Sequence, residues 1–101
     1  MKYFMLEGSF KKDRPRGDVF KEALKGHMAY WQEYYDAGST LVSGAKIGVG
    51  GGIVVFKLED DVDINDVIAK DPFVSAGVME YNVVPFDVIL VKDAVKDWAG
   101  K

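Results

Sequence analysis

The sequence predicts a single α+β domain whose elements follow the order strand, helix, strand, strand, helix, strand. Two kinds of pattern support this order. Residues 20–35 and 64–68 repeat apolar side chains at helical spacing. Runs of apolar, β-branched and aromatic residues, typical of strands, occur at residues 3–8, 40–46, 53–58 and 78–91. A chain of 101 residues leaves room for one such domain, residues 1–101, and little more.

The first strand and the first helix come from the N-terminal third of the chain. Tyr3 to Gly8 is predicted to be a strand, and the polar stretch Lys11 to Gly17 a loop. Asp18 is expected to cap the helix, because an aspartate side chain can accept from free backbone amides. Gly38 is expected to stop the helix just after Ala37. The apolar stripe of this helix consists of Phe20, Ala23, Leu24, His27, Met28, Trp31, Tyr34 and Tyr35.

Thr40 to Lys46 and Ile53 to Leu58 are expected to form a β-hairpin. The glycines between them supply the unusual backbone angles of tight turns. A phosphate-binding loop is not expected here, since such a loop follows a strand, opens a helix and ends in Lys-Ser or Lys-Thr. We therefore expect Gly50 to Gly52 to form a flexible hairpin tip that does not bind phosphate.

The second helix is predicted to be short. Residues 64–68 carry an amphipathic pattern that ends near Lys70, because Pro72 disfavours helical geometry at Asp71. Residues 73–76 are expected to add one more helical turn.

The last strand is predicted to be long. Residues 78–91 are expected to form one strand interrupted at Pro85, followed by a polar tail at residues 92–101. The complete order is that of the ferredoxin-like, or split βαβ, arrangement, in which two helices cover one face of a four-stranded antiparallel sheet.

The predicted strands are apolar on both faces, although two helices can bury only one face. Residues 3–6, 53–56 and 88–91 show no alternation with polar residues. An antiparallel sheet whose second face meets water normally does alternate. We therefore expect a second copy of the chain to cover that face in a homodimer, since a large bare apolar patch would favour association.

The composition excludes several classes of function. The chain has no cysteine, and therefore no disulfide framework, thiol nucleophile or thiolate metal site. A net charge of −3 does not favour nucleic-acid binding. No apolar run approaches the roughly 20 residues of a membrane helix, and the N-terminus lacks the features of a signal peptide. These features predict a cytoplasmic protein.

His27 is the only histidine and lies on the apolar stripe of the first helix. One hypothesis is a half-buried histidine satisfied by a single hydrogen bond. The other is a proton carrier, because an imidazole changes charge near neutral pH. With one histidine and no spaced pair of carboxylates, neither a metal site nor a cofactor is predicted.

Asp71 precedes a proline at a helix end, where aspartate often bonds its own backbone. In a split βαβ fold, however, an inward residue of the first helix can meet a residue at the end of the second. A carboxylate there would accept from one imidazole nitrogen and favour the charged ring. The pair His27 and Asp71 is therefore the main candidate for chemistry. Arg14 and Arg16 are a further candidate, as a rim that attracts carboxylates.

The chain resembles the YCII-related (YciI-like) family from Tyr3 to about Val91. The resemblance implies a ferredoxin-like domain that dimerises as a dimeric α+β barrel, with His27 and Asp71 as active-site residues and Ser43 and Gly44 in the substrate region. A related enzyme acts on a chlorinated muconolactone, which implies ring-shaped organic acids or lactones as substrates. The residues that carry the resemblance are Gly26-His27-Met28, Ser43-Gly44, Asp71-Pro72-Phe73-Val74-Ser75-Ala76-Gly77-Val78 and Val84-Pro85-Phe86.

Three functional hypotheses remain open from the sequence. The first is a cofactor-free isomerase, lyase or dehalogenase that uses His27 and Asp71 for proton transfer. The second is a small-molecule binding or sensing module with no turnover. The third is a structural dimer with a vestigial site. The first two require a pocket that reaches His27, whereas the third predicts a closed core around it.

Overall fold

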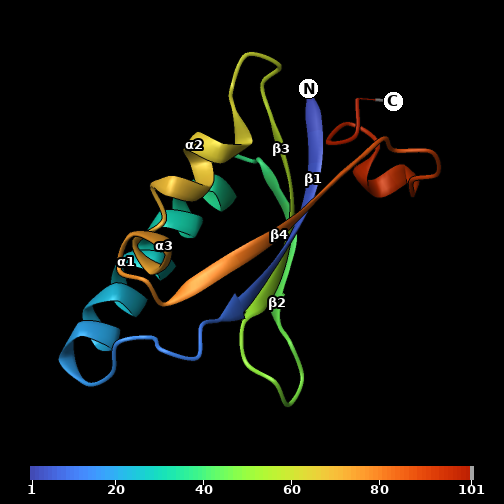
Figure 1. Ribbon diagram of the computed structural model, residues 1–101. Coiled ribbons are helices and arrows are strands. Elements are labelled where there is room, and N and C mark those ends of the chain that lie inside the picture. Colours follow the sequence, from blue (N-terminus) through green and yellow to red (C-terminus); the bar gives the residue numbers. More distant parts are fainter. Residues whose placement is uncertain (101) are drawn as a thin grey trace.

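A computed structural model describes residues 1–100, and its sheet and helices confirm the predicted α+β fold (Figure 1). The sheet has the strand order β2-β3-β1-β4, and all neighbouring strands are antiparallel. Three helices lie together on one side of this sheet (Figure 1). The elements are β1 (Lys2–Phe10), α1 (Asp18–Asp36), β2 (Thr40–Ala45), β3 (Gly52–Leu58), α2 (Ile64–Ala69), α3 (Pro72–Ser75), β4 (Met79–Phe86) and the 3₁₀ turn η1 (Asp93–Val95).

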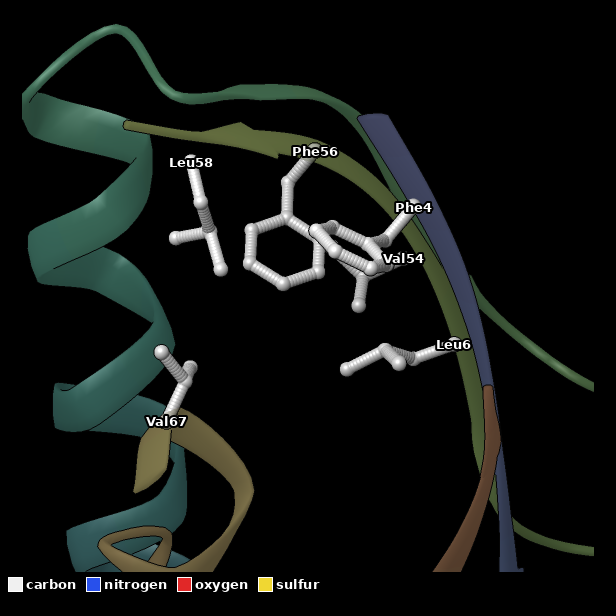
Figure 2. Packing of buried hydrophobic residues seen from close by; sticks show 6 residues of the cluster. All are labelled: Phe4, Leu6, Val54, Phe56, Leu58 and Val67. Carbon is white, nitrogen blue, oxygen red and sulfur yellow. The ribbon is translucent and has the colours of Figure 1, made fainter. Parts of the chain in front are cut away.

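The main core lies between the helices and the two central strands. Alternate residues of β1 and β3 point toward the helices, which is why the burial of both strands alternates. Phe4 and Phe56 are cross-strand partners whose ring centroids lie 6.0 Å apart. Figure 2 shows these side chains gathered between the sheet and Val67 of α2. The buried cluster consists of Phe4, Leu6, Val54, Phe56, Leu58 and Val67.

The ends of α1 differ in part from the sequence-based prediction. Gly38 ends the helix with a φ of 81°, as expected. Asp18, however, does not cap the N-terminus, because it is already the first helical residue. The N-cap is Gly17, whose φ of 67° is readily adopted only by glycine, and no side chain bonds the free amides there. Asp18 instead places its charge in the first turn, which favours acidic residues.

The prediction of a long last strand is wrong, because β4 ends at Phe86. β4 lies at the sheet edge and pairs only with β1, and the last register pair is Tyr3 with Phe86. Since β1 begins at Lys2, no strand remains for residues 87–91 to pair with. Pro85 stays inside the strand opposite Phe4, which an edge strand tolerates.

Residues 92–100 are more than a polar tail, since they pack on the sheet face that is opposite the helices (Figure 1). Trp98 contacts Tyr3 edge to face at 5.3 Å and donates from Nε1 to the carbonyl oxygen of Ser39 at 3.1 Å. The ammonium of Lys57 donates to the carbonyl of Trp98 at 2.9 Å, and Ala99 is buried. The chain therefore covers one end of its own outer sheet face. No helix within residues 1–100 has the length and apolar character to cross a membrane.

Candidate functional site

The site begins where α1 passes close to α3. Gly26 allows this approach, because a Cβ atom at that position would lie 2.9 Å from Cγ and 3.0 Å from Cβ of Pro72. The residues that follow Gly26 and precede Pro72 are His27 and Asp71. The close helix contact therefore brings these two side chains together. It also explains why Gly26 precedes His27 and why Pro72 follows Asp71.

Asp71 is a fully buried carboxylate that is surrounded by donors. Its side chain caps α3 by accepting from the amide of Phe73 at 2.9 Å. Nδ1 of His27 lies 3.0 Å from both oxygens. Oδ2 also accepts from Nε1 of Trp31 at 2.9 Å and from the hydroxyl of Tyr81 at 2.6 Å. Donors from α1, α3 and β4 thus converge on a single carboxylate and fix its position.

These contacts determine the charge state of Asp71. Burial alone would raise the pKa of the carboxyl group, but the hydrogen bonds from His27, Tyr81, Trp31 and the Phe73 amide outweigh burial and lower it. Asp71 is therefore an anion at neutral pH, and Nδ1 of His27 is the donor in their contact. Burial, and then the hydrogen bond to Asp71, raise the pKa of Tyr81, which keeps the hydroxyl protonated and able to donate.

The imidazole of His27 is held by two neighbours. Its ring stacks on Phe73, with centroids 4.1 Å apart and planes 18° apart. Nδ1 is engaged by Asp71, so Nε2 is the nitrogen available to a bound molecule. The side chain is 19% exposed and lines a cavity, in contrast to the closed core that a vestigial site predicts.

The cavity has a volume of about 630 Å³ and lies between α1 and the β2–β3 hairpin. Its walls are mainly apolar and aromatic, and among the lining residues within residues 1–100 only His27 is of a basic type. Ser43 and Thr40 add hydroxyl groups from β2, and Oγ1 of Thr40 is buried without a hydrogen-bond partner in the described part of the chain. The lining consists of Phe10, Leu24, His27, Met28, Trp31, Gln32, Tyr35, Thr40, Ser43, Gly44, Ala45, Gly51, Gly52, Ile53, Val54, Phe73, Met79 and Tyr81.

The structure brings four of the six candidate residues together. His27 and Asp71 are in contact, and Ser43 and Gly44 line the same cavity. Among the described residues, the cavity lining does not include Arg14 or Arg16. The guanidinium of Arg14 lies over the ring of Phe10 at 5.1 Å and donates to the carbonyl of Lys11, and Arg16 is exposed.

Sequence reasoning missed the roles of Trp31 and Tyr81. Trp31 was expected only to pack within the helix, and Tyr81 received no role. The residue types themselves are a usable signal, because the polar group of a buried tryptophan or tyrosine normally has a hydrogen-bond partner. Residue spacing cannot identify that partner, since 40 and 10 positions separate these residues from Asp71.

The fold and this junction define a ferredoxin-like α+β domain with a buried carboxylate–histidine pair beside a cavity. A family model for the YCII-related domain matches residues 1–87, and the chain therefore belongs to the family of YCII-related domains. The resemblance seen in the sequence is thus confirmed. No curated protein matches the sequence significantly.

One similar solved structure is 5-chloro-2-hydroxyhydroquinone dehydrochlorinase from Burkholderia phenoliruptrix, in complex with 2,5-dihydroxybenzoquinone. The TM-score is 0.65, with 17% sequence identity over 83% of this chain and 92% of that chain. A likeness at this level of identity shows a shared fold.

Proposed function

We propose that this chain is a cofactor-free enzyme in which His27 moves a proton on or off a small organic acid or lactone. One observation carries the proposal: Nδ1 of His27 is held by the buried Asp71 at 3.0 Å while the same ring lines a cavity. Histidine suits this role because it changes charge near neutral pH. A fixed hydrogen bond at Nδ1 also sets the tautomer, so that the neutral ring offers Nε2 as a base.

In this proposal, His27 alone contacts the reacting atoms. Asp71 is fully buried and accepts from four residues, so it orients the ring and stabilises the cation that forms. When Nε2 removes a proton from a carbon next to a carbonyl, the electrons of the C–H bond form a C=C bond to the carbonyl carbon, and the π electrons of the C=O bond move onto its oxygen to give an enolate. Return of the proton to another carbon completes an isomerisation. Departure of a leaving group with its bonding electrons, such as chloride, completes an elimination.

The cavity supports a ring-shaped substrate. Aromatic side chains from α1, α3 and β4 suit a flat molecule, and the hydroxyl groups of Ser43 and Thr40 can bond its oxygens. The similar dehydrochlorinase binds a dihydroxybenzoquinone. We extend that chemistry to this chain as part of the proposal, with Ser43 and Gly44 as substrate contacts.

A ligand panel tests this function. We expect small carboxylic acids, lactones or 2,5-dihydroxybenzoquinone to raise the melting temperature of the wild-type protein. His27→Ala should weaken that shift, whereas Lys25→Ala, an exposed substitution on the same helix, should leave it unchanged. For any compound that is turned over, His27→Ala should lower the rate by about 10²–10⁴ and Asp71→Asn by a similar or smaller factor. Full activity of His27→Ala contradicts the mechanism.

The same panel separates catalysis from binding alone. A compound that binds at His27 and is recovered unchanged favours a sensing or binding module. The cavity reaches His27, and both hypotheses require this geometry.

We further propose that the protein is a homodimer through the outer sheet face. The tail covers the end near Tyr3, the middle of the face is apolar and partly exposed, and Glu7 and Asn82 lie toward the other end. Val42 is 56% exposed, Ile53 39% and Val84 37%, and Met5 and Val55 lie between them in the register. An exposed patch of this kind is typical of an interface between subunits.

A charge placed on the outer face tests the dimer. Val84→Glu should yield a monomer in sedimentation at micromolar concentration, because a dimer would have to bury the carboxylate. Val19→Glu adds the same charge at an exposed position on α1 and should remain dimeric. A stable wild-type monomer contradicts the proposal.

A further inference from the structure

Tyr81 makes the shortest hydrogen bond to the Asp71 carboxylate. Its hydroxyl lies 2.6 Å from Oδ2, compared with 2.9 Å for the indole of Trp31 and 3.0 Å for His27. A hydroxyl that donates to a carboxylate lies at about 2.5–2.7 Å, so the Tyr81 distance marks a charge-assisted hydrogen bond, which is stronger than a neutral one. Tyr81 therefore has a strong hold on the carboxylate that orients the imidazole, although it comes from a different layer of the fold.

The sheet makes room for Tyr81 through a glycine. Gly8 is the register partner of Tyr81 on the neighbouring strand β1. A Cβ atom at Gly8 would lie 2.8 Å from Cε1 of Tyr81 and 2.5 Å from Sδ of Met79, so a larger residue would require at least one of them to move. The tyrosine reaches Asp71 across a space that only a residue without a side chain leaves open.

We propose that Tyr81 is a positioning residue of the site: its hydroxyl shares the charge of Asp71 and so limits how firmly the carboxylate holds His27 in its cationic form. The inference rests on the proposed function, in which His27 must both gain and lose a proton. A carboxylate with fewer donors would attract the imidazolium more strongly. His27 would then be held more firmly as a cation and would serve less well as a base.

The surroundings of Asp71 support a specific role for this hydroxyl. No lysine or arginine within residues 1–100 forms an ion pair with Asp71, so hydrogen bonds distribute its charge. Burial, followed by neighbouring groups that include the Asp71 charge, raises the pKa of Tyr30, but the hydroxyl of Tyr30 donates to the carbonyl of Val67 at 2.6 Å. The groups that donate to the carboxylate are His27 and Trp31 from α1, the amide of Phe73 from α3, and Tyr81 from β4, whereas Tyr30 of α1 is near enough to be affected by its charge but donates elsewhere.

The experiment is an NMR titration of the only histidine, whose Cε1–H signal needs no assignment by mutation. Tyr81→Phe should move the midpoint of the His27 signal change to higher pH, since one strong donor to the partner carboxylate is lost. Gly8→Ala should move it in the same direction by displacing the Tyr81 ring. Tyr30→Phe is the matched control: it removes a tyrosine hydrogen bond of equal length that does not reach Asp71, and should leave the midpoint in place.

An unchanged or lower midpoint in Tyr81→Phe overturns the proposal, as does an equal shift in Tyr30→Phe. If Tyr81→Phe does not fold, Gly8→Ala, which displaces the Tyr81 ring, must give the upward shift instead. The titration needs no substrate, so a negative ligand panel would contradict the proposed enzyme without deciding the role of Tyr81. Conversely, an unchanged midpoint in an active enzyme would contradict only the role of Tyr81.

Discussion

The two sides of the sheet carry similar apolar residues in very different surroundings. On the helix-facing side, Phe56 and Leu6 have no exposed surface, and Phe4 retains 5%. On the outer side, Val55 is half-buried and Val42 is more than half exposed. The same strands supply both faces, so the difference in exposure comes from what covers each face.

This comparison shows that apolar residues in one strand can have two different structural roles. On the helix-facing side, apolar residues fill a core that the chain completes by itself. On the outer side, the tail covers the end near Tyr3, and apolar residues in the middle of the face stay partly exposed. The helix-facing side also holds the buried charge of Asp71, which places the proposed chemistry in the region that the chain buries by itself.

The largest expected effect is on the helix-facing side. Phe56→Ala should lower the free energy of unfolding by about 3–5 kcal/mol, because it removes a fully buried ring. Val55→Ala, one residue earlier and pointing outward, should cost less than about 1 kcal/mol in a monomer. Urea titrations measure both values. Equal costs at low protein concentration would contradict the difference between the two sides.

The next effect tests the buried charge. Asp71→Asn should lower the free energy of unfolding by about 3 kcal/mol at pH 7, because the amide cannot accept from four groups and carries donors of its own. The pKa of Asp71 is lowered in the folded protein, so near pH 4 the unfolded chain binds more protons than the folded chain. This carboxylate therefore stabilises the fold fully above its ordinary pKa of 3.8 and loses its effect as the pH falls below it.

Urea titrations across pH check the sign. The wild-type protein should lose its advantage over Asp71→Asn as the pH falls from about 5 to 2. Asp60→Asn is a suitable control, since Asp60 is an exposed carboxylate whose pKa is lowered by the N-terminal ammonium. It should change the pH dependence far less, because an exposed ion pair contributes little. A constant difference between wild type and Asp71→Asn would contradict the assigned charge of Asp71.

Much of the fold could be predicted because it depends on patterns among residues that are close together in the sequence. The helical spacing of residues 20–35 and the glycine at position 38 predicted α1 to within one residue at its end. The end of β4 could not be predicted in this way. Residues 87–91 have strand-forming side chains, but a strand also requires a partner, and β1 starts too late to supply one. Likewise, the position of Trp98 depends on Tyr3 and Ser39, which are far away in the sequence.

The candidate site divides in the same way. His27 and Asp71 could be paired from the fold type, because two helices on one sheet face bring those positions together. Arg14 and Arg16 were candidates because of their charge alone, and charge does not predict where a loop places its side chains relative to a cavity. Tyr81 could not be found from spacing, since its place beside Asp71 depends on the space at Gly8 in another strand.

A smaller effect on stability is expected at the contact between α1 and α3. Gly26→Ala favours the helix by about 1 kcal/mol, but the new methyl group overlaps the ring of Pro72 at a cost of about 1–3 kcal/mol. The net loss should be about 1 kcal/mol, and it should be accompanied by a weaker His27–Asp71 contact. An NMR signal of the Nδ1 proton of His27 should broaden or disappear, while Lys25→Ala leaves it intact. A sharp Nδ1 signal in Gly26→Ala would show that the close approach is unnecessary.

The smallest effect belongs to the tail on the outer side. Trp98→Phe keeps an aromatic ring against Tyr3 but loses the donor to the carbonyl of Ser39. That carbonyl also accepts from the amide of Lys57 at 3.0 Å, so the substitution leaves no buried acceptor without a partner. The loss in free energy of unfolding should therefore stay near 0.5–1 kcal/mol. Trp98→Ala, which also removes the contact with Tyr3, should cost more, and a urea titration separates the two variants. If Trp98→Phe costs as much as Phe56→Ala, the tail is part of the core, and the two sides of the sheet do not differ as argued.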